Sequence, residues 1–283
     1  MIALLRAVFR YFLFTSLFIT GCALLMVQQT KDLLLLQYDH EGYLLFVFFA
    51  TICSYNFHWY LTPDTPSENE RVRWTQQHKR LHLVLTLMGF AGACVLFFRF
   101  SHHWIWLGGA VVLTFLYSAP KLHVGPFRLL RKIAIGKTLF LTFVWTYVTT
   151  ILPLAFDGRW TTPGILFCLS RFFLIYAICI LFDYRDREYD KQEGMRSLIT
   201  YLDEKGINVL FAITILLFTA STAALYYWGF SLLNVCLLFI PSVILVRLYP
   251  VAKTNFSDYL YYFVLDGLMM LSAMLTTLAG WLM

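Results

Sequence analysis

The chain has few charged residues for its length. Asp, Glu, Lys and Arg together make up 13% of its 283 residues, while 60% of the residues are hydrophobic. A soluble domain of this size could not bury so much apolar surface, which excludes an ordinary soluble globular fold. The sequence also has no C-x-x-C pair, no G-x-x-x-x-G-K-[ST] loop, no G-x-G-x-x-G fingerprint and no G-x-S-x-G elbow. These absences disfavour a metal or redox role for the cysteines, nucleotide-driven transport and serine hydrolysis.

Long apolar runs recur along the whole chain. A helix needs about 20 apolar residues to cross the hydrocarbon layer of a bilayer, and nine runs approach or exceed that length. No separate soluble domain fits between them. The sequence therefore predicts an all-α, polytopic membrane bundle of about nine transmembrane helices that forms a single domain over residues 1–283. The expected spans lie near residues 11–29, 42–61, 81–98, 104–119, 133–154, 163–182, 206–227, 230–249 and 258–282.

The basic residues outside these spans are distributed unevenly. Seventeen Lys and Arg residues fall on the side of the N-terminus and three fall on the other side. By the positive-inside rule, the N-terminus is expected in the cytoplasm and the C-terminus outside, with the protein in the inner (cytoplasmic) cell membrane. The basic residues form short clusters without a continuous basic face, so nucleic acid is not an expected partner.

An acidic segment follows the sixth predicted span. If the helix continues through this segment, Asp183, Asp186 and Asp190 are spaced i, i+3 and i+7 and share one face. Three neighbouring carboxylates repel one another unless a cation neutralises them, and Mg²⁺ prefers oxygen ligands. The alternative is a charged helix end whose Asp and Arg side chains pair with one another in solvent. The spacing alone leaves both interpretations open.

The same segment resembles the second aspartate-rich motif of the UbiA-type intramembrane prenyltransferases. That motif contains R-D-x-E-x-D followed by G-x-R-T-L, and this chain reads D-Y-R-D-R-E-Y-D from Asp183 and G-M-R-S-L from Gly194. The sequence Y-S-A-P from Tyr117 is similar to the Y-S-x-P signature of the family, which also precedes a basic loop. The nine-helix layout agrees with the family, so the resemblance covers essentially the whole chain.

The first aspartate-rich motif of the family is degenerate here. It resembles N-D-x-x-D-x-x-x-D and helps to hold the Mg²⁺ ions that bridge to the diphosphate. Asn56 and Asp64 fit this pattern, but Phe57 and Tyr60 stand in place of two aspartates. Basic loop residues such as Arg71 and Arg73 could complete a phosphate site, because Arg and Lys bind phosphate directly. The alternative is a scaffold that binds a lipid or quinone without ionising a diphosphate.

The resemblance implies a function and a set of site residues. The implied reaction is Mg²⁺-assisted transfer of a prenyl group from a prenyl diphosphate to an aromatic, quinone-precursor or other lipophilic acceptor within the bilayer. The alternatives are a catalytically inactive relative that binds an isoprenoid lipid or a partner, and a transporter. The metal-binding and catalytic residues implied are Asp183, Asp186 and Asp190. The diphosphate-binding residues implied are Asn56, Asp64, Lys121, Arg128, Arg131, Arg185 and Arg196.

Ionisable residues inside the predicted spans are further candidates, because burying such groups in hydrocarbon is costly. Asp266 is expected to pair with Arg171 or Lys137 and to line or brace a central cavity. A purely structural ion pair is the alternative interpretation. Aromatic side chains at the membrane boundary could face a carbocation or form an ordinary aromatic belt. The cavity-lining residues expected are Tyr60, Tyr117, Lys137, Arg171 and Asp266.

Overall fold

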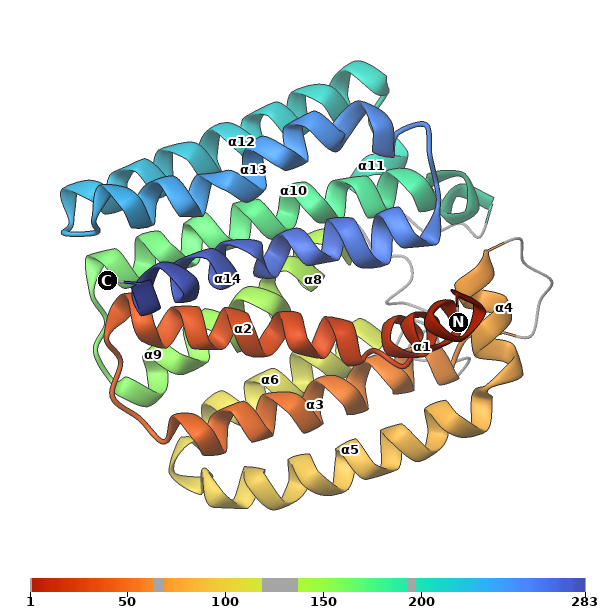
Figure 1. Ribbon diagram of the computed structural model, residues 1–283, viewed down its shortest axis with the longest axis horizontal. Helices are drawn as coiled ribbons and strands as arrows, with labels where there is room; N and C mark the ends of the chain where they lie inside the picture. The colour runs from red at the N-terminus through yellow and green to blue at the C-terminus, as the bar shows by residue number, and fades with distance from the viewer. Residues whose placement is uncertain (1, 64–68, 119–136, 193–196, 283) are drawn as a thin grey trace.

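Long helices lie side by side in the computed structural model, and the described residues contain no strand (Figure 1). The structure describes residues 2–63, 69–118, 137–192 and 197–282. The helices are α1 (Ile2–Phe14), α2 (Leu17–Leu34), α3 (His40–Tyr60), α4 (Glu70–Gln77), α5 (Lys79–Arg99), the 3₁₀ turn η1 (Ser101–His103), α6 (Trp104–Ser118), α8 (Lys137–Thr146), the π-helix η4 (Tyr147–Ile151), α9 (Leu152–Asp157), α10 (Thr162–Gln192), α11 (Leu198–Tyr201), α12 (Glu204–Tyr227), α13 (Leu232–Ala252), the π-helix η5 (Leu260–Leu265) and α14 (Asp266–Leu282).

Six helices among the described residues are long and apolar enough to cross a membrane. They are α5, the continuous α8–η4–α9 helix, α10, α12, α13 and η5–α14. The bent pair of α1 and α2 would supply a seventh. The predicted count of nine is not confirmed. Helix α3 has 21 residues but carries polar side chains near both ends, and only 15 residues of α6 lie within the described part.

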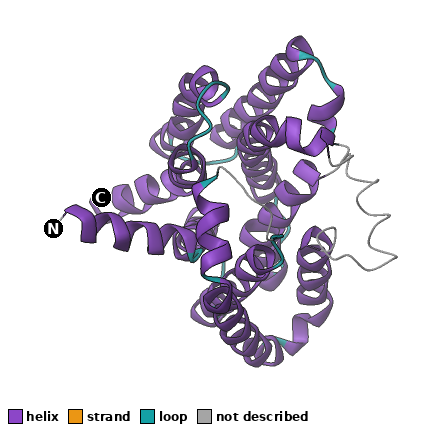
Figure 2. Ribbon diagram, turned by 90° about the vertical axis from the view of Figure 1, so that its right-hand side faces the viewer, coloured by secondary structure: helices purple, strands orange, loops and turns teal. Residues whose placement is uncertain are grey.

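The outer surface of the bundle is apolar. Helices α5 and α12 present large hydrophobic side chains to the surroundings, among them Phe90, Val95, Phe98 and Leu216. In the view of Figure 2 the helices are seen nearly end-on and are joined by short loops. A helix satisfies its backbone hydrogen bonds internally, so this architecture suits a lipid environment. The coarse prediction of an all-helical, multi-pass membrane protein therefore holds.

The first predicted span is broken at Ser16. This residue has a left-handed backbone with φ of 68°, and the axes of α1 and α2 differ by 59° across the break. A side chain disfavours positive φ, so tertiary contacts must stabilise this turn. One such contact is present, because the Asn56 side-chain amide donates to the Thr15 carbonyl oxygen at 3.1 Å. The expected continuous helix over residues 11–29 is thus two helices.

Arg171 ties the middle of the bundle together. Its Nη1 donates to the backbone oxygens of Met26 and Thr149, each at 2.9 Å, and its Nη2 donates to Gln29 Oε1 at 2.8 Å. Thr149 lies in the π-helix η4, where the altered hydrogen-bond pattern leaves carbonyl groups available. Further bonds run from Nη1 to two threonine hydroxyls. The buried cation therefore joins α2, η4 and α10.

Asp266 was expected to pair with Arg171 or Lys137; the pair with Arg171 is not formed, and the side chain of Lys137 lies outside the described part. All hydrogen-bond acceptors of Arg171 among the described residues are neutral carbonyl, hydroxyl or amide oxygens. Asp266 instead interacts electrostatically with Arg71 and Arg185. The sequence placed both Arg171 and Asp266 inside spans, but it did not reveal which partners each would meet.

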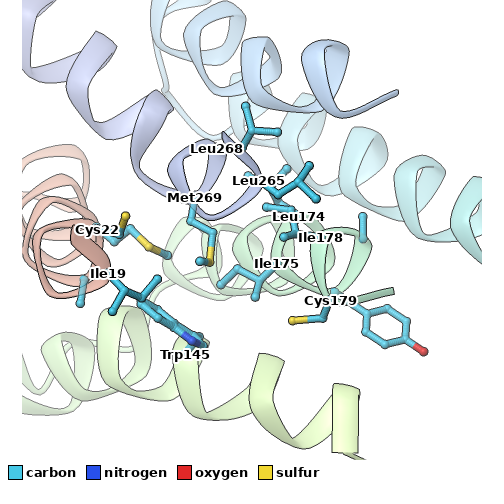
Figure 3. Packing of buried hydrophobic residues seen from close by; sticks show 14 of the residues in the cluster. Ile19, Cys22, Trp145, Leu174, Ile175, Ile178, Cys179, Leu265, Leu268 and Met269 are labelled. Carbon is cyan, nitrogen blue, oxygen red and sulfur yellow. The ribbon is translucent and has the colours of Figure 1, made fainter. Parts of the chain in front are cut away.

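Apolar packing surrounds this polar tie. Figure 3 shows side chains from α2, α8, α10, η5 and α14 converging in the interior. The labelled residues there are Ile19, Cys22, Trp145, Leu174, Ile175, Ile178, Cys179, Leu265, Leu268 and Met269. They belong to one large cluster of buried hydrophobic residues. Helices far apart in the sequence are thereby held in contact.

Replacing Arg171 by Met should destabilise the fold. The substitution leaves the oxygens of Met26, Thr149 and Gln29 without their donor, which costs about 2–5 kcal/mol in total. The free energy of unfolding in mixed micelles measures the effect. Arg80→Met, at an exposed arginine, is the control and should change stability by less than about 0.5 kcal/mol. Equal stability of the two variants would contradict a structural role for Arg171.

Candidate functional site

The candidate site lies where α1, α3, α10 and α13 meet α4 and η5. We call this end of the bundle, on the right in Figure 1, the α4 end. Phe14 of α1 packs its ring against Trp74 of α4 with a centroid separation of 5.7 Å. Trp59 of α3 meets Tyr262 of η5 at 6.0 Å. Aromatic rings from three elements, α1, α3 and η5, therefore lie around the short helix α4.

Arg71 lies at the centre of these rings. Its side chain is buried, with 3% of the residue exposed, although it belongs to no membrane span. The guanidinium carbon lies 4.3 Å from the ring centroid of Trp59 and 4.2 Å from that of Tyr262. Cation–π contacts of this kind favour a desolvated guanidinium. Burial lowers the pKa of Arg71, yet an arginine remains protonated in such surroundings.

The backbone of α4 is fixed by Asp258. The Arg71 backbone N–H donates to Asp258 Oδ2 at 2.8 Å, and the carboxylate is buried. This bond joins residues that are 187 positions apart in the sequence. The guanidinium of Arg71, in contrast, forms no hydrogen bond or ion pair with any residue in the described ranges. Its Nε is buried without a partner.

Arg185 approaches the same ring from α10. Its Nη2 donates to the Tyr262 hydroxyl at 2.9 Å, and its guanidinium carbon lies 4.9 Å from the Tyr262 ring centroid. Its Nε donates to Asp186 Oδ1 at 3.0 Å, and its Nη1 lies 3.8 Å from Asp258 Oδ1. Tyr262 thus contacts the guanidinium groups of both arginines, while Asp258 meets the backbone of Arg71 and the side chain of Arg185.

Asn56 is engaged within the protein. Its Nδ2 donates to the carbonyl oxygens of Thr15 and Ile52 at 3.1 and 2.8 Å. Its oxygen faces His82 Nδ1 at 2.7 Å, so Nδ1 carries the proton. Nε2 of His82 is then a buried acceptor without a partner. Diphosphate binding by Asn56 stays a prediction, whereas in the structure its amide positions α1, α3 and α5.

The three predicted metal-binding aspartates all lie on α10, which continues beyond the expected span through Gln192, so the condition for their shared face is met. Asp183 is buried and accepts a hydrogen bond from the Thr138 hydroxyl. Asp186 accepts from Arg185, and Asp190 is also buried. Within the described ranges, no three His, Cys, Asp or Glu side chains come close enough together to hold a metal ion. The carboxylates share a helix without forming such a group.

The remaining predicted residues are partly accounted for. Asp266 is half-buried at the start of α14 and, as described above, interacts with the two arginines of the α4 end. Tyr60 is half-buried, and the ring of Tyr117 stacks on His58 with centroids 5.2 Å apart. The backbone of Lys137 begins α8, and its side chain lies outside the described part. The other predicted residues outside the described part are Asp64, Lys121, Arg128, Arg131 and Arg196.

The sequence matches the model of the UbiA prenyltransferase family over residues 62–258, which is more than half of the chain. The chain belongs to the UbiA prenyltransferase family. No curated protein and no solved structure matches it. The UbiA match begins after Phe57 and Tyr60, the two positions that depart from the first motif. It includes α4, α10 and Asp258, which build most of the α4 end.

The sequence does not distinguish several residues of this candidate site. The sequence offers Arg71 and Arg73 equally as phosphate-binding residues, but they lie two positions apart on α4 and so point to different sides. Arg71 is buried and Arg73 is exposed. The signal that could have separated them is the helical spacing of Arg71, Trp74 and Thr75, which form the buried face of α4. No local pattern identified Asp258 as the partner of the α4 backbone.

The bond between Asn56 and His82 should show energetic coupling. Asn56→Ala, His82→Ala and the double variant form a cycle whose non-additivity is expected to be about 1–2 kcal/mol, because each residue leaves the other with an unmet polar atom. The free energy of unfolding in mixed micelles supplies all four values. Fully additive effects would show that the two side chains do not depend on each other.

Proposed function

We propose that this UbiA family member transfers a prenyl group from a prenyl diphosphate to a lipophilic acceptor at the α4 end of the bundle. Family membership supports the class of reaction, membrane-embedded prenyl transfer. The acceptor class proposed is an aromatic or quinone-precursor compound. The observation that carries the site assignment is the pair of buried arginines, Arg71 and Arg185, on the ring of Tyr262.

The proposed chemistry places specific demands on this site. The bond between the allylic carbon and the diphosphate oxygen breaks, and its electron pair leaves with the diphosphate. Guanidinium groups in a dry pocket stabilise the negative charge that develops there. The allylic cation left behind is favoured by aromatic faces such as those of Trp59 and Tyr262. The acceptor then forms a bond to that carbon and loses a proton.

Magnesium assistance stays a prediction from the family resemblance. The acidic side chains within the described ranges do not gather into a group that could hold an ion, as shown above for α10. We therefore assign no step to a metal. What the described residues supply toward the diphosphate is positive charge from arginine and fixed aromatic walls.

We propose that the α4 end faces the cytoplasm. The loops at this end carry most of the Lys and Arg residues of the chain, in the arrangement that the positive-inside rule associates with the cytoplasmic side. Placement in the inner (cytoplasmic) cell membrane, with the C-terminus outside, follows from the same rule. A water-soluble diphosphate headgroup would then enter from the cytoplasm, while its prenyl tail stays in the lipid.

A catalytically inactive relative that binds an isoprenoid lipid is the second candidate. Phe57 and Tyr60 favour it, because they replace two aspartates of the first motif. The engagement of Asn56 with Thr15 and His82 also favours it, since a third element of that motif is then occupied. The two candidates differ in whether diphosphate is released.

Turnover distinguishes the two candidates. Purified protein in nanodiscs should release pyrophosphate from a prenyl diphosphate in the presence of a panel of phenolic and quinone-precursor acceptors. Arg71→Ala should slow release roughly 10–100-fold, as expected for losing one charge-assisted contact to the leaving group. A coupled pyrophosphate assay measures the rate, with Arg73→Ala as the control on the same helix. Tight binding of the donor without release by the parent protein would favour the inactive relative.

A further inference from the structure

Two arginines of this chain are buried to the same degree but are satisfied very differently. Arg171 is 5% exposed and donates five hydrogen bonds to described residues. Arg71 is 3% exposed, and its guanidinium donates none within the described part of the chain. A guanidinium has five N–H donors, and leaving them unmet in a buried place is costly. No residue in the described ranges supplies an acceptor to the Arg71 guanidinium, and its buried Nε has no hydrogen-bond partner.

Other unmatched polar atoms lie at the same end. Buried atoms without a hydrogen-bond partner occur next to the break between α1 and α2, on α4, at the start of α5, near the end of α10 and just before η5. Such atoms are rare in folded proteins, and a bound ligand that offers complementary polar groups could satisfy them. They are Ser16 Oγ, Arg71 Nε, Thr75 Oγ1, His82 Nε2, Arg185 Nη1 and Asp258 Oδ1.

Of the two described arginines at Tyr262, Arg185 forms ion pairs and Arg71 does not. Arg185 has Asp186 and Asp258 within ion-pair distance. Among the described residues, no carboxylate lies within ion-pair distance of the Arg71 guanidinium. Asp258 meets the Arg71 backbone N–H, and Asp266 acts on the guanidinium only from farther away. The missing acceptor should therefore be an oxyanion, which a guanidinium can bind through two parallel bonds.

The altered first motif lies next to the Arg71 guanidinium. Phe57 and Tyr60 replace two aspartates that the resemblance associates with metal binding. In the same turn of α3, Trp59 supports the Arg71 guanidinium from 4.3 Å. An aromatic ring and an arginine thus lie beside the motif whose carboxylates, by the resemblance, would hold a metal ion.

Resting on the proposed function, we propose that Arg71 binds the phosphate oxygens of the diphosphate directly, with no metal ion between the guanidinium and the anion. The rings of Trp59 and Tyr262 both lie against the guanidinium, so the anion approaches the N–H groups that the rings leave uncovered. Arg185, fixed on the same tyrosine, offers Nη1 as a second donor. The site would therefore bind pyrophosphate in the absence of divalent cations.

Pyrophosphate binding tests this proposal. Isothermal titration calorimetry on the full chain in zwitterionic nanodiscs, with chelator or with Mg²⁺, should give dissociation constants within about threefold of each other. Arg71→Ala should weaken binding at least about tenfold in both conditions, the loss expected for one charge-assisted contact. Arg71→Lys, which keeps the charge but not the planar fork, should lie in between. Arg73→Ala should leave binding unchanged.

Three results would overturn the proposal. The first is pyrophosphate binding that requires Mg²⁺ and is indifferent to Arg71→Ala, which would leave the proposed transferase function standing. The second is strong competition by anionic lipid, which would assign the site to a phospholipid headgroup. The third is no binding of pyrophosphate or of a prenyl thiodiphosphate in either condition, which would remove the proposed function as well.

Variant folding is checked separately. Each variant is compared with the parent by thermal unfolding before titration. If the Arg71 variants do not fold, the parent alone decides the question. Pyrophosphate in chelator should then raise its unfolding temperature, because a ligand that binds only the folded state stabilises it. No rise in chelator, together with a rise in Mg²⁺, would contradict metal-free binding.

Discussion

A buried guanidinium must find acceptors, and this constraint organises the bundle. Inside a membrane protein no bulk water is available to satisfy polar groups, so the protein or a ligand must do so. Arg171 meets the constraint with carbonyl, hydroxyl and amide oxygens of α2 and η4, and thereby fixes the centre of the bundle. Arg71 is equally buried, but its guanidinium meets only aromatic rings among the described residues. Arg171 therefore links helices of the bundle, and Arg71 is the centre of the candidate site.

The α4 end is assembled by a chain of polar contacts around that site. The left-handed turn at Ser16 leaves the Thr15 carbonyl free to accept a hydrogen bond from Asn56 Nδ2, while the side-chain oxygen of Asn56 faces His82. Asp258 anchors the backbone of α4 and places Arg71 between Trp59 and Tyr262. The match to the UbiA prenyltransferase family includes α4 and Asp258 of this end. The altered first motif and Arg71 are in contact, because Trp59 lies between Phe57 and Tyr60 in the sequence and packs against the Arg71 guanidinium.

The sequence predicted the class of fold and the location of some site residues. Apolar runs predicted the long helices, and the face shared by the three aspartates depended on a continuation of α10 that the structure shows. It did not predict the break at Ser16, the partners of Asp266 or the burial of Arg71. These depend on contacts between distant segments, such as Arg71 with Asp258, for which local periodicity carries no signal. The roles of the basic residues in the segment 119–136 stay predictions, because that segment lies outside the described part.

The most direct measurement is an experimental structure of the protein in nanodiscs with a prenyl thiodiphosphate, obtained in the presence of chelator. The account predicts phosphate oxygens within hydrogen-bond distance of the Arg71 guanidinium, between the rings of Trp59 and Tyr262, with the prenyl chain directed into the bundle. A diphosphate bound beside Asp183 and Asp190 without contact to Arg71, or visible only after Mg²⁺ is restored, would contradict it.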